Sequence, residues 1–374
     1  MSRTDVTPAR PGARTGASVR KASGFAVVGT PAPGLSALVA ELCEAFARAG
    51  FVAAEPGATP SLVLNVVDAA APRPFRRRSS GTFAAALWSL PEKPDDGLLE
   101  TYPMLVRALA NISLCYVPGH GMLFTTMERG HYLVPDDEKL PDAVVGRLAP
   151  LARARLVIDN DFRTDLEREL WTGDLLTREL SEAGRRLDRL GLLPAPFPVE
   201  DLVSPRDLRH IKRLYSIGGL SYGNLSTRKD EARFWMSASG VDKSKLVEPG
   251  RDILLVSGYD AAGGRMILSV PPGVEPRRVS VDAIEHWMIY RENPEVGAIL
   301  HVHAWIDGIE ATEINYPCGS EELAESVAAL VAAAPDPGHA VVGLRNHGIT
   351  ATGESLTEIL ERIEPRLQRR VPMT

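Results

Sequence analysis

The sequence predicts an α/β protein with two domains joined by a connector. Short apolar runs of strand length alternate with segments in which apolar residues recur every three or four positions, as they do in amphipathic helices. A charged helical stretch near the middle of the chain ends in three prolines within five residues, which is typical of a domain boundary. The length of 374 residues is enough for two or three domains of common size.

The composition indicates a soluble globular protein. Hydrophobic residues make up 44% of the chain and charged residues 24%, and the net charge of −6 does not favour nucleic acid as a partner. Cys43, Cys115 and Cys318 are too few and too widely spaced for a disulfide framework. Apolar runs are all shorter than the ~18–20 residues that span a bilayer. We therefore expect a cytoplasmic protein without a nucleic-acid or membrane partner.

Residues 1–22 are expected to form a disordered tail. They combine Arg3, Arg10, Arg14, Arg20 and Lys21 with small and polar residues. The apolar segment of a secretory signal does not follow this basic start.

Residues 23–146 predict an N-terminal α/β domain of unknown role. Strands are expected over residues 25–29, 62–67, 83–87, 122–126 and 132–134, and helices over 35–46 and 98–114. Pro103 should lie in the first turn of the second helix or break it. Glycine-rich dinucleotide and Walker motifs are absent, so a second enzyme and a ligand sensor both remain open for this domain.

Residues 147–205 predict a helical and proline-rich connector. Oppositely charged side chains three or four residues apart, as in residues 165–170 and 176–180, support exposed helices. Pro194, Pro196 and Pro198 stiffen the end of this segment.

A second domain is expected over residues 206–374. A short helix over 207–215 precedes a glycine-rich turn over 216–228, and a strand over 234–241 ends in a second small polar turn. Such turns can present backbone N–H groups to an anion, although each alone is more simply a tight turn.

The chemistry of this domain centres on residues 298–304, an apolar run that contains His-x-His. In a strand, His301 and His303 face the same side, because side chains alternate with period two. His347 follows His303 by 44 residues, again at the end of an apolar run. Three neutral imidazoles with an open coordination position suit Zn²⁺, with Mn²⁺, Fe²⁺ or Co²⁺ as alternatives.

Together with the histidines, several short motifs resemble the class II aldolase/adducin family. The resemblance covers about residues 206–365, and residues 1–205 have no counterpart in it. The motifs, in order, are Gly223-Asn224-Leu225-Ser226-Thr227-Arg228, Ser237-Ala238-Ser239-Gly240-Val241, Asp282 four residues before His286, His301-Val302-His303, Gly319-Ser320-Glu321-Glu322-Leu323-Ala324 and Asn346-His347-Gly348.

The resemblance, which is to fuculose-phosphate aldolase-like members, implies an αβα sandwich around a mainly antiparallel sheet. It implies that His301, His303 and His347 bind the metal ion. It also implies a homo-tetramer with the site between subunits. The residues that would bind the phosphate or other anionic end of a small-molecule substrate are Gly223, Asn224, Ser226, Ser239, Gly240 and Ser280.

Asp282 stands where the aldolases of the family carry an acid/base glutamate. Its role is either proton transfer beside the metal ion or capping of the helix that starts at Ala283. Glu285, one helical turn on, is expected to be exposed. Val281 replaces a serine of the usual phosphate-binding pattern, and no tyrosine follows Tyr316, which argues against an epimerase.

The sequence therefore predicts a metal-dependent lyase of carbohydrate metabolism, acting on a sugar-phosphate-like or hydroxy-keto acid substrate through a metal-stabilised enediolate. Aldol cleavage is the first expectation, with dehydration or decarboxylation as alternatives. A catalytically inactive, adducin-like interaction module is the remaining alternative.

Overall fold

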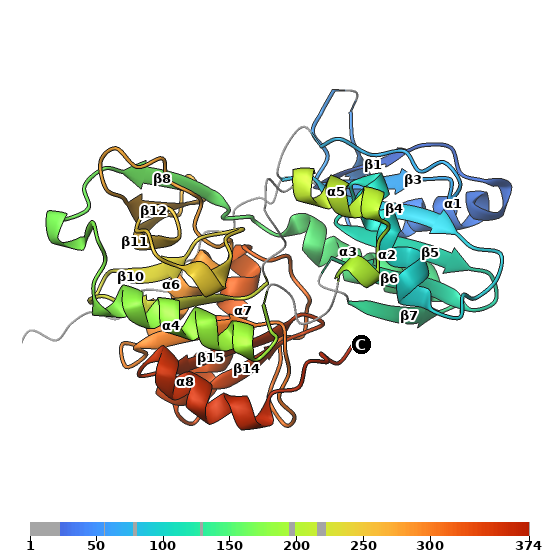
Figure 1. The fold of residues 1–374 in the computed structure, drawn as a ribbon. Coiled ribbons are helices and arrows are strands. Elements are labelled where there is room, and N and C mark those ends of the chain that lie inside the picture. Colours follow the sequence, from blue (N-terminus) through green and yellow to red (C-terminus); the bar gives the residue numbers. More distant parts are fainter. Residues whose placement is uncertain are drawn as a thin grey trace, which may run out of the picture.

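The computed structural model describes residues 23–55, 57–77, 81–127, 130–193, 199–214 and 222–373. They form two lobes, each built on one β-sheet with helices packed against it (Figure 1). The prediction of a mixed α/β protein is confirmed. The expected tail over residues 1–22 lies outside the described residues.

The N-terminal lobe contains a seven-stranded sheet with the order β2-β1-β3-β4-β5-β6-β7. Neighbours from β2 to β5 pair parallel, and β6 and β7 continue the sheet antiparallel. Helices cover both faces of this sheet, so its central strands are buried on both sides. This explains why those strands are apolar along most of their length. The elements are β1 (Ser23–Val28), α1 (Pro33–Arg48), β2 (Phe51–Ala53), β3 (Leu62–Val66), β4 (Phe83–Ser89), α2 (Gly97–Ala108), β5 (Ile112–Val117), β6 (Gly121–Thr126), β7 (His131–Pro135) and α3 (Leu140–Arg153).

One helix of this lobe differs from the prediction. The helix expected over residues 98–114 ends at Ala108, where Leu109 adopts a left-handed conformation, and residues 112–117 form β5. The apolar run of β5 is buried in the sheet, and periodicity alone cannot distinguish such a run from a helix. Pro103 lies inside α2 rather than in its first turn, so the prediction for its position was wrong.

The C-terminal lobe contains an eight-stranded sheet with the order β14-β15-β13-β9-β10-β11-β12-β8. Among the described strands, β8 pairs parallel with β12, and the other neighbours pair antiparallel. The strands are β8 (Asp159–Arg163), β9 (Asn224–Arg228), β10 (Phe234–Ser237), β11 (Ile253–Asp260), β12 (Arg265–Ser269), β13 (Ala298–Val302), β14 (Val341–Leu344) and β15 (Gly348–Gly353). The helices are α4 (Leu175–Arg189), α6 (Ala283–Glu292), α7 (Glu321–Ala333) and α8 (Leu356–Ile363).

The segment expected as a connector supplies part of the C-terminal lobe. β8 forms the edge of its sheet, and α4 buries Leu180 and Leu187 in its core. Of the two charged stretches that suggested exposed helices, residues 176–180 lie in α4, whose apolar positions at helical spacing face inward. Residues 165–170 instead precede α4 and contain only the short 3-10 helix Arg168–Leu170. The structure therefore places residues 159–193 in the C-terminal lobe.

The following helix, α5 (Pro205–Leu214), packs on the N-terminal lobe beside α2 (Figure 1). Arg107 of α2 forms an ion pair with Asp207 of α5 at 2.9 Å. Residues 194–198, which include the three prolines, lie outside the described residues.

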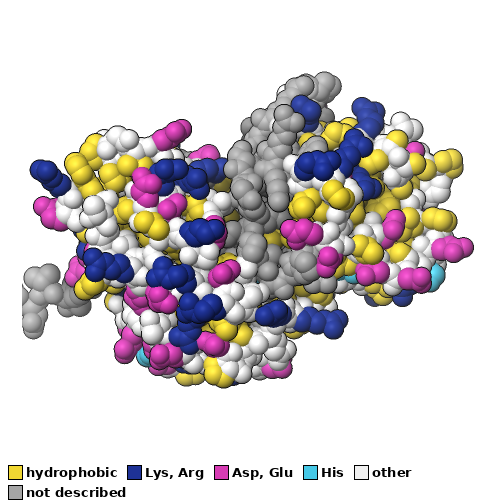
Figure 2. All heavy atoms as spheres, viewed as in Figure 1, with side chains coloured by type: hydrophobic (Ala, Val, Ile, Leu, Met, Phe, Trp, Pro, Cys, Tyr) yellow, Lys and Arg dark blue, Asp and Glu magenta, His cyan; other side chains and the backbone are white. Residues whose placement is uncertain are grey.

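The visible surface carries basic and acidic side chains interspersed over both lobes (Figure 2). Within the described ranges, none of the helices combines the length and the apolar character needed to cross a bilayer.

Candidate metal centre

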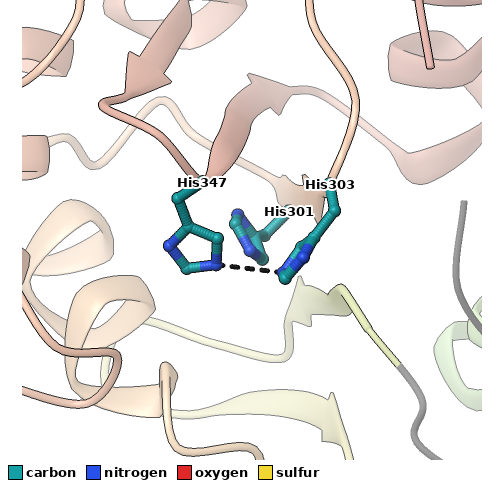
Figure 3. A group of neighbouring side chains, drawn as sticks. All are labelled: His301, His303 and His347. Carbon is teal, nitrogen blue, oxygen red and sulfur yellow. Dashed lines mark hydrogen bonds between the residues drawn. The ribbon is translucent and has the colours of Figure 1, made fainter. Parts of the chain in front are cut away.

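Three histidines from two segments of the C-terminal lobe converge on one point (Figure 3). His301 lies on β13, between β9 and β15, and His303 follows at the end of that strand. His347 lies in the turn between β14 and β15, where Asn346 has a φ of 57°. One ligand atom from each ring lies within 4.8 Å of the others, and Nε2 of His303 is 3.0 Å from Nε2 of His347.

The hydrogen bonds and burial of these rings fit a divalent metal ion. Nδ1 of His301 donates to the carbonyl oxygen of Ile349 at 3.0 Å, which leaves Nε2 with its lone pair. Nε2 of His301 and Nδ1 of His303 are both buried without a hydrogen-bond partner among the described residues. Burial lowers the pKa of His301 to about 4 and the pKa of His303 well below its ordinary value. Both rings are therefore neutral, which is the form that binds metal ions.

Asp282 lies next to this cluster and is buried. Nδ2 of Asn224 donates to its Oδ2 at 2.7 Å, and Oδ1 is buried without a partner among the described residues. Its side chain makes no capping hydrogen bond to α6, although it precedes that helix. Burial raises the pKa of Asp282, while His347, the Asn224 hydrogen bond and Lys243 act in the opposite direction.

Glu285 is buried, with 1% of its surface exposed, so the expectation of an exposed helix glutamate was wrong. Oγ1 of Thr350 donates to its Oε1 at 2.6 Å and lies 3.4 Å from Nδ1 of His301. Burial and the neighbouring Asp282 raise the pKa of Glu285 to about 8. Glu285 therefore holds its proton at neutral pH.

Sequence reasoning missed Lys243, which is 2% exposed and lies on a short 3-10 helix, Lys243–Lys245. Burial lowers its pKa to about 8, although Asp282 and Asp242 favour the charged form. A lysine in a polar turn is normally solvated, so only the packing around the turn reveals this residue.

The predicted anion-binding residues fall into two groups. Asn224 and Gly223 lie beside the histidines. Asn224 pairs with His301 across the sheet. Gly223 has a φ of +76°, and a Cβ at this position would clash with the His301 carbonyl oxygen. Ser226 points toward α6 instead, and its hydroxyl is within 2.6 Å of Nδ1 of His286 and 2.9 Å of the Tyr290 hydroxyl.

The other three predicted residues lie after β10 and before α6. Ser239 is exposed, and its N–H donates to the carbonyl of Arg278. Gly240 has a φ of +67°, and Ser280 is buried with its N–H donating to the carbonyl of Ser237. Of the glycine-rich turn expected over residues 216–228, residues 216–221 lie outside the described residues, and residues 224–228 form β9 instead of a turn.

Comparison with known proteins identifies relatives of the C-terminal lobe. Residues 211–306 match the Class II Aldolase and Adducin N-terminal domain. A methylthioribulose-1-phosphate dehydratase of Leptospira biflexa is 33% identical over 102 residues, which are 27% of this chain and 43% of the relative. One of Xanthomonas campestris is 35% identical over 86 residues, 23% of this chain and 34% of the relative. The chain thus spans less than half the length of these curated relatives.

Solved structures similar to this chain are more distant in sequence. The L-fuculose-1-phosphate aldolase of Thermus thermophilus is 20% identical with a TM-score of 0.33, covering 51% of this chain and 90% of its own. YgbL of Klebsiella pneumoniae, described as a putative aldolase/epimerase/decarboxylase, is 21% identical with a TM-score of 0.32, covering 51% and 84%. The family match over residues 211–306 contains His301 and His303, and His347 lies beyond it.

Proposed function

The chain contains a class II aldolase/adducin domain in its C-terminal half, and we propose from this that it is a metal-dependent lyase acting on a small oxygenated substrate. The observation that carries the proposal is the buried cluster of three imidazoles beside the two buried carboxyl groups of Asp282 and Glu285. Packing alone does not require three histidines to converge, so an inactive interaction module is the weaker alternative.

His301, His303 and His347 would hold the metal ion, with zinc as the first candidate and manganese, iron or cobalt as alternatives. When bound, it would supply a Lewis acid for the negative charge that develops on a substrate carbonyl oxygen.

Asp282 is the proposed proton acceptor. Its Oδ1 makes no hydrogen bond among the described residues, while Asn224 fixes the orientation of the carboxyl group through Oδ2. In dehydration, this group takes a proton from the carbon next to the carbonyl and returns it to the hydroxyl on the following carbon, which leaves as water while a carbon–carbon double bond forms. In aldol cleavage, it takes the proton of a hydroxyl while a carbon–carbon bond breaks. The buried Glu285, whose pKa is raised to about 8, adds no negative charge beside Asp282 at neutral pH.

We assign the anionic end of the substrate to Gly223 and Asn224, at the turn before β9, where the Asn224 amide has a second N–H beside the one that donates to Asp282. Ser226, whose hydroxyl already lies between His286 and Tyr290, is a weaker candidate for that role. The curated relatives are named methylthioribulose-1-phosphate dehydratases, so dehydration of this sugar phosphate is the first reaction to test, ahead of aldol cleavage.

The test uses tag-free protein loaded separately with Zn²⁺, Mn²⁺, Fe²⁺ and Co²⁺. Each form is incubated with methylthioribulose-1-phosphate, and mass spectrometry follows the loss of one water; short ketose phosphates are screened in parallel for cleavage. We expect turnover that requires a metal ion and disappears in the His303→Ala variant. Full activity of that variant, or no bound metal after incubation with excess Zn²⁺, would contradict the proposal.

The tetramer with a site between subunits, which the family resemblance implies, remains a prediction. Light scattering of the full chain at several concentrations measures the assembly directly, and a monomer would rule it out.

A further inference from the structure

Tyr222 connects the metal centre to the N-terminal lobe. It precedes Gly223 and β9, and its ring lies against the imidazole of His303, with 4.8 Å between ring centroids and an angle of 53° between the planes. The opposite end of the side chain reaches the other lobe, because the Tyr222 hydroxyl donates to the carbonyl oxygen of Met127 at 3.1 Å. A single side chain therefore contacts both a predicted metal ligand and the N-terminal lobe.

The Met127 carbonyl is held in place from within the N-terminal lobe. Met127 follows β6, and the hydroxyl of Tyr102 on α2 donates to the same oxygen at 2.9 Å. Tyr102 is fully buried in an apolar cluster that includes Val106 and Leu202, and Met127 and Tyr222 pack against that cluster. The position of the carbonyl that receives Tyr222 is thus set by a packed core.

The start of β7 approaches the segment that carries His347. A Cβ built on Gly130 would lie 3.5 Å from the carbonyl oxygen of Asn346, an ordinary van der Waals distance. The neighbouring Arg345 lies near enough to Tyr132 of β7 to lower the pKa of its phenol, against the larger effect of burial. The N-terminal lobe thus meets the metal centre at His303 through Tyr222, and beside His347 through Gly130.

We propose that the N-terminal lobe contributes to metal binding. Tyr222, whose hydroxyl bonds to the Met127 carbonyl, is the positioning residue for His303. The proposal rests on the proposed metal-dependent function, because it assigns the ring contact a role in ligand geometry. Residues that fix the orientation of a histidine ligand raise metal affinity by limiting the rotation of its ring. Tyr222 would do this from outside the strand, and the N-terminal lobe would supply the anchor.

Two substitutions separate the ring contact from the anchor. Tyr222→Leu removes both the aromatic ring and the hydroxyl. Tyr222→Phe keeps the ring against His303 and removes only the hydrogen bond to Met127. The control is Tyr116→Phe. It also removes a tyrosine hydroxyl, but this hydroxyl lies within the N-terminal lobe and donates to Asp136 at 3.0 Å.

The first readout is the Zn²⁺ affinity of the full chain, measured by competition with a chromophoric chelator. We expect Tyr222→Leu to weaken binding by about 10–100-fold, as loss of an outer contact to a ligand does. Tyr222→Phe should weaken binding less than Tyr222→Leu does, because the ring contact remains and only its anchor on Met127 is lost. The Tyr116→Phe control should match wild type.

The second readout is amide hydrogen exchange at Thr126 and Gly130, whose N–H groups bond within the N-terminal lobe. Zn²⁺ binding should slow exchange at both amides in wild type and in the control, and this protection should be lost in Tyr222→Phe as well as Tyr222→Leu. A Tyr222→Leu variant that binds Zn²⁺ as tightly as wild type, or wild-type amides that do not respond to Zn²⁺, would refute this inference alone. A wild-type chain that binds no divalent ion would refute the proposed function, and this inference with it.

Discussion

The buried carboxyl group of Glu285 makes stability depend on pH in a direction opposite to that of an ordinary paired carboxylate. Its pKa is raised in the folded protein from 4.5 to about 8, first by burial and then by Asp282. Between these values the folded state holds a proton that the unfolded state has lost. The contribution of Glu285 to stability is therefore complete below about pH 4.5 and is lost as pH rises toward 8.

The perturbation is Glu285→Gln, which is neutral at every pH and keeps an oxygen to accept the Thr350 hydrogen bond. One proton difference between the two states changes the free energy of unfolding by about 1.4 kcal/mol per pH unit. Between pH 5 and 7, the advantage of wild type over the variant should therefore shrink by about 2–3 kcal/mol. Groups that do not interact with Glu285 contribute equally to both proteins and cancel in the difference, whereas Asp282, which raises the pKa of Glu285, does not cancel fully.

The assay is urea unfolding of metal-free protein at several pH values. Tryptophan fluorescence reports mainly on the C-terminal lobe, because four of the five tryptophans, Trp171, Trp235, Trp287 and Trp305, lie there. Glu292→Gln, an exposed substitution on the same helix, is the matched control and should follow wild type. Parallel pH profiles for wild type and Glu285→Gln would refute the conclusion that Glu285 holds a proton at neutral pH.

Three further predictions concern the ligands, the proton acceptor and the packing behind them. His303→Ala should lose the bound metal ion found in wild type by elemental analysis; an unchanged metal content would exclude this ligand set. Asp282→Asn keeps an oxygen for the Asn224 hydrogen bond, so it should fold normally yet lose about 10²–10⁴-fold in kcat on whichever substrate wild type converts; wild-type turnover would leave Asp282 without a role in proton transfer. Gly343→Ala places a Cβ 2.4 Å from a ring atom of Trp305, which should lower the free energy of unfolding by about 1–3 kcal/mol; an unchanged urea midpoint would contradict that packing.

Much of this protein could be predicted from short stretches of sequence. Strands such as β3 and β13 and helices such as α1 follow from apolar periodicity, which each segment carries by itself. The class II aldolase/adducin relationship of the C-terminal half was also predictable, and it is confirmed by the family match. These features depend on residues that are close in the chain.

Some boundaries depended on partners elsewhere in the chain. β8 resembles an ordinary polar segment, and it becomes a strand because β12 offers it an edge more than 100 residues later. The charged side chains of α4 suggested an exposed helix. The helix also has an apolar face, and that face is buried only because the sheet packs against it. Local propensity is a weak guide where tertiary contacts decide the outcome.

The sequence by itself determined which residues are predicted to carry the chemistry: the His-x-His of β13, the later His347 and the carboxyl group at Asp282. Only the tertiary structure decided their electrostatic environment, because the burial of Glu285 and Lys243 and their raised and lowered pKa values depend on elements packed from several parts of the chain. The contact of Tyr222 with both His303 and Met127 likewise exists only once the two lobes are packed together. Residue type sets what a side chain can do, whereas desolvation and long-range neighbours set its charge and position, and no local pattern records them.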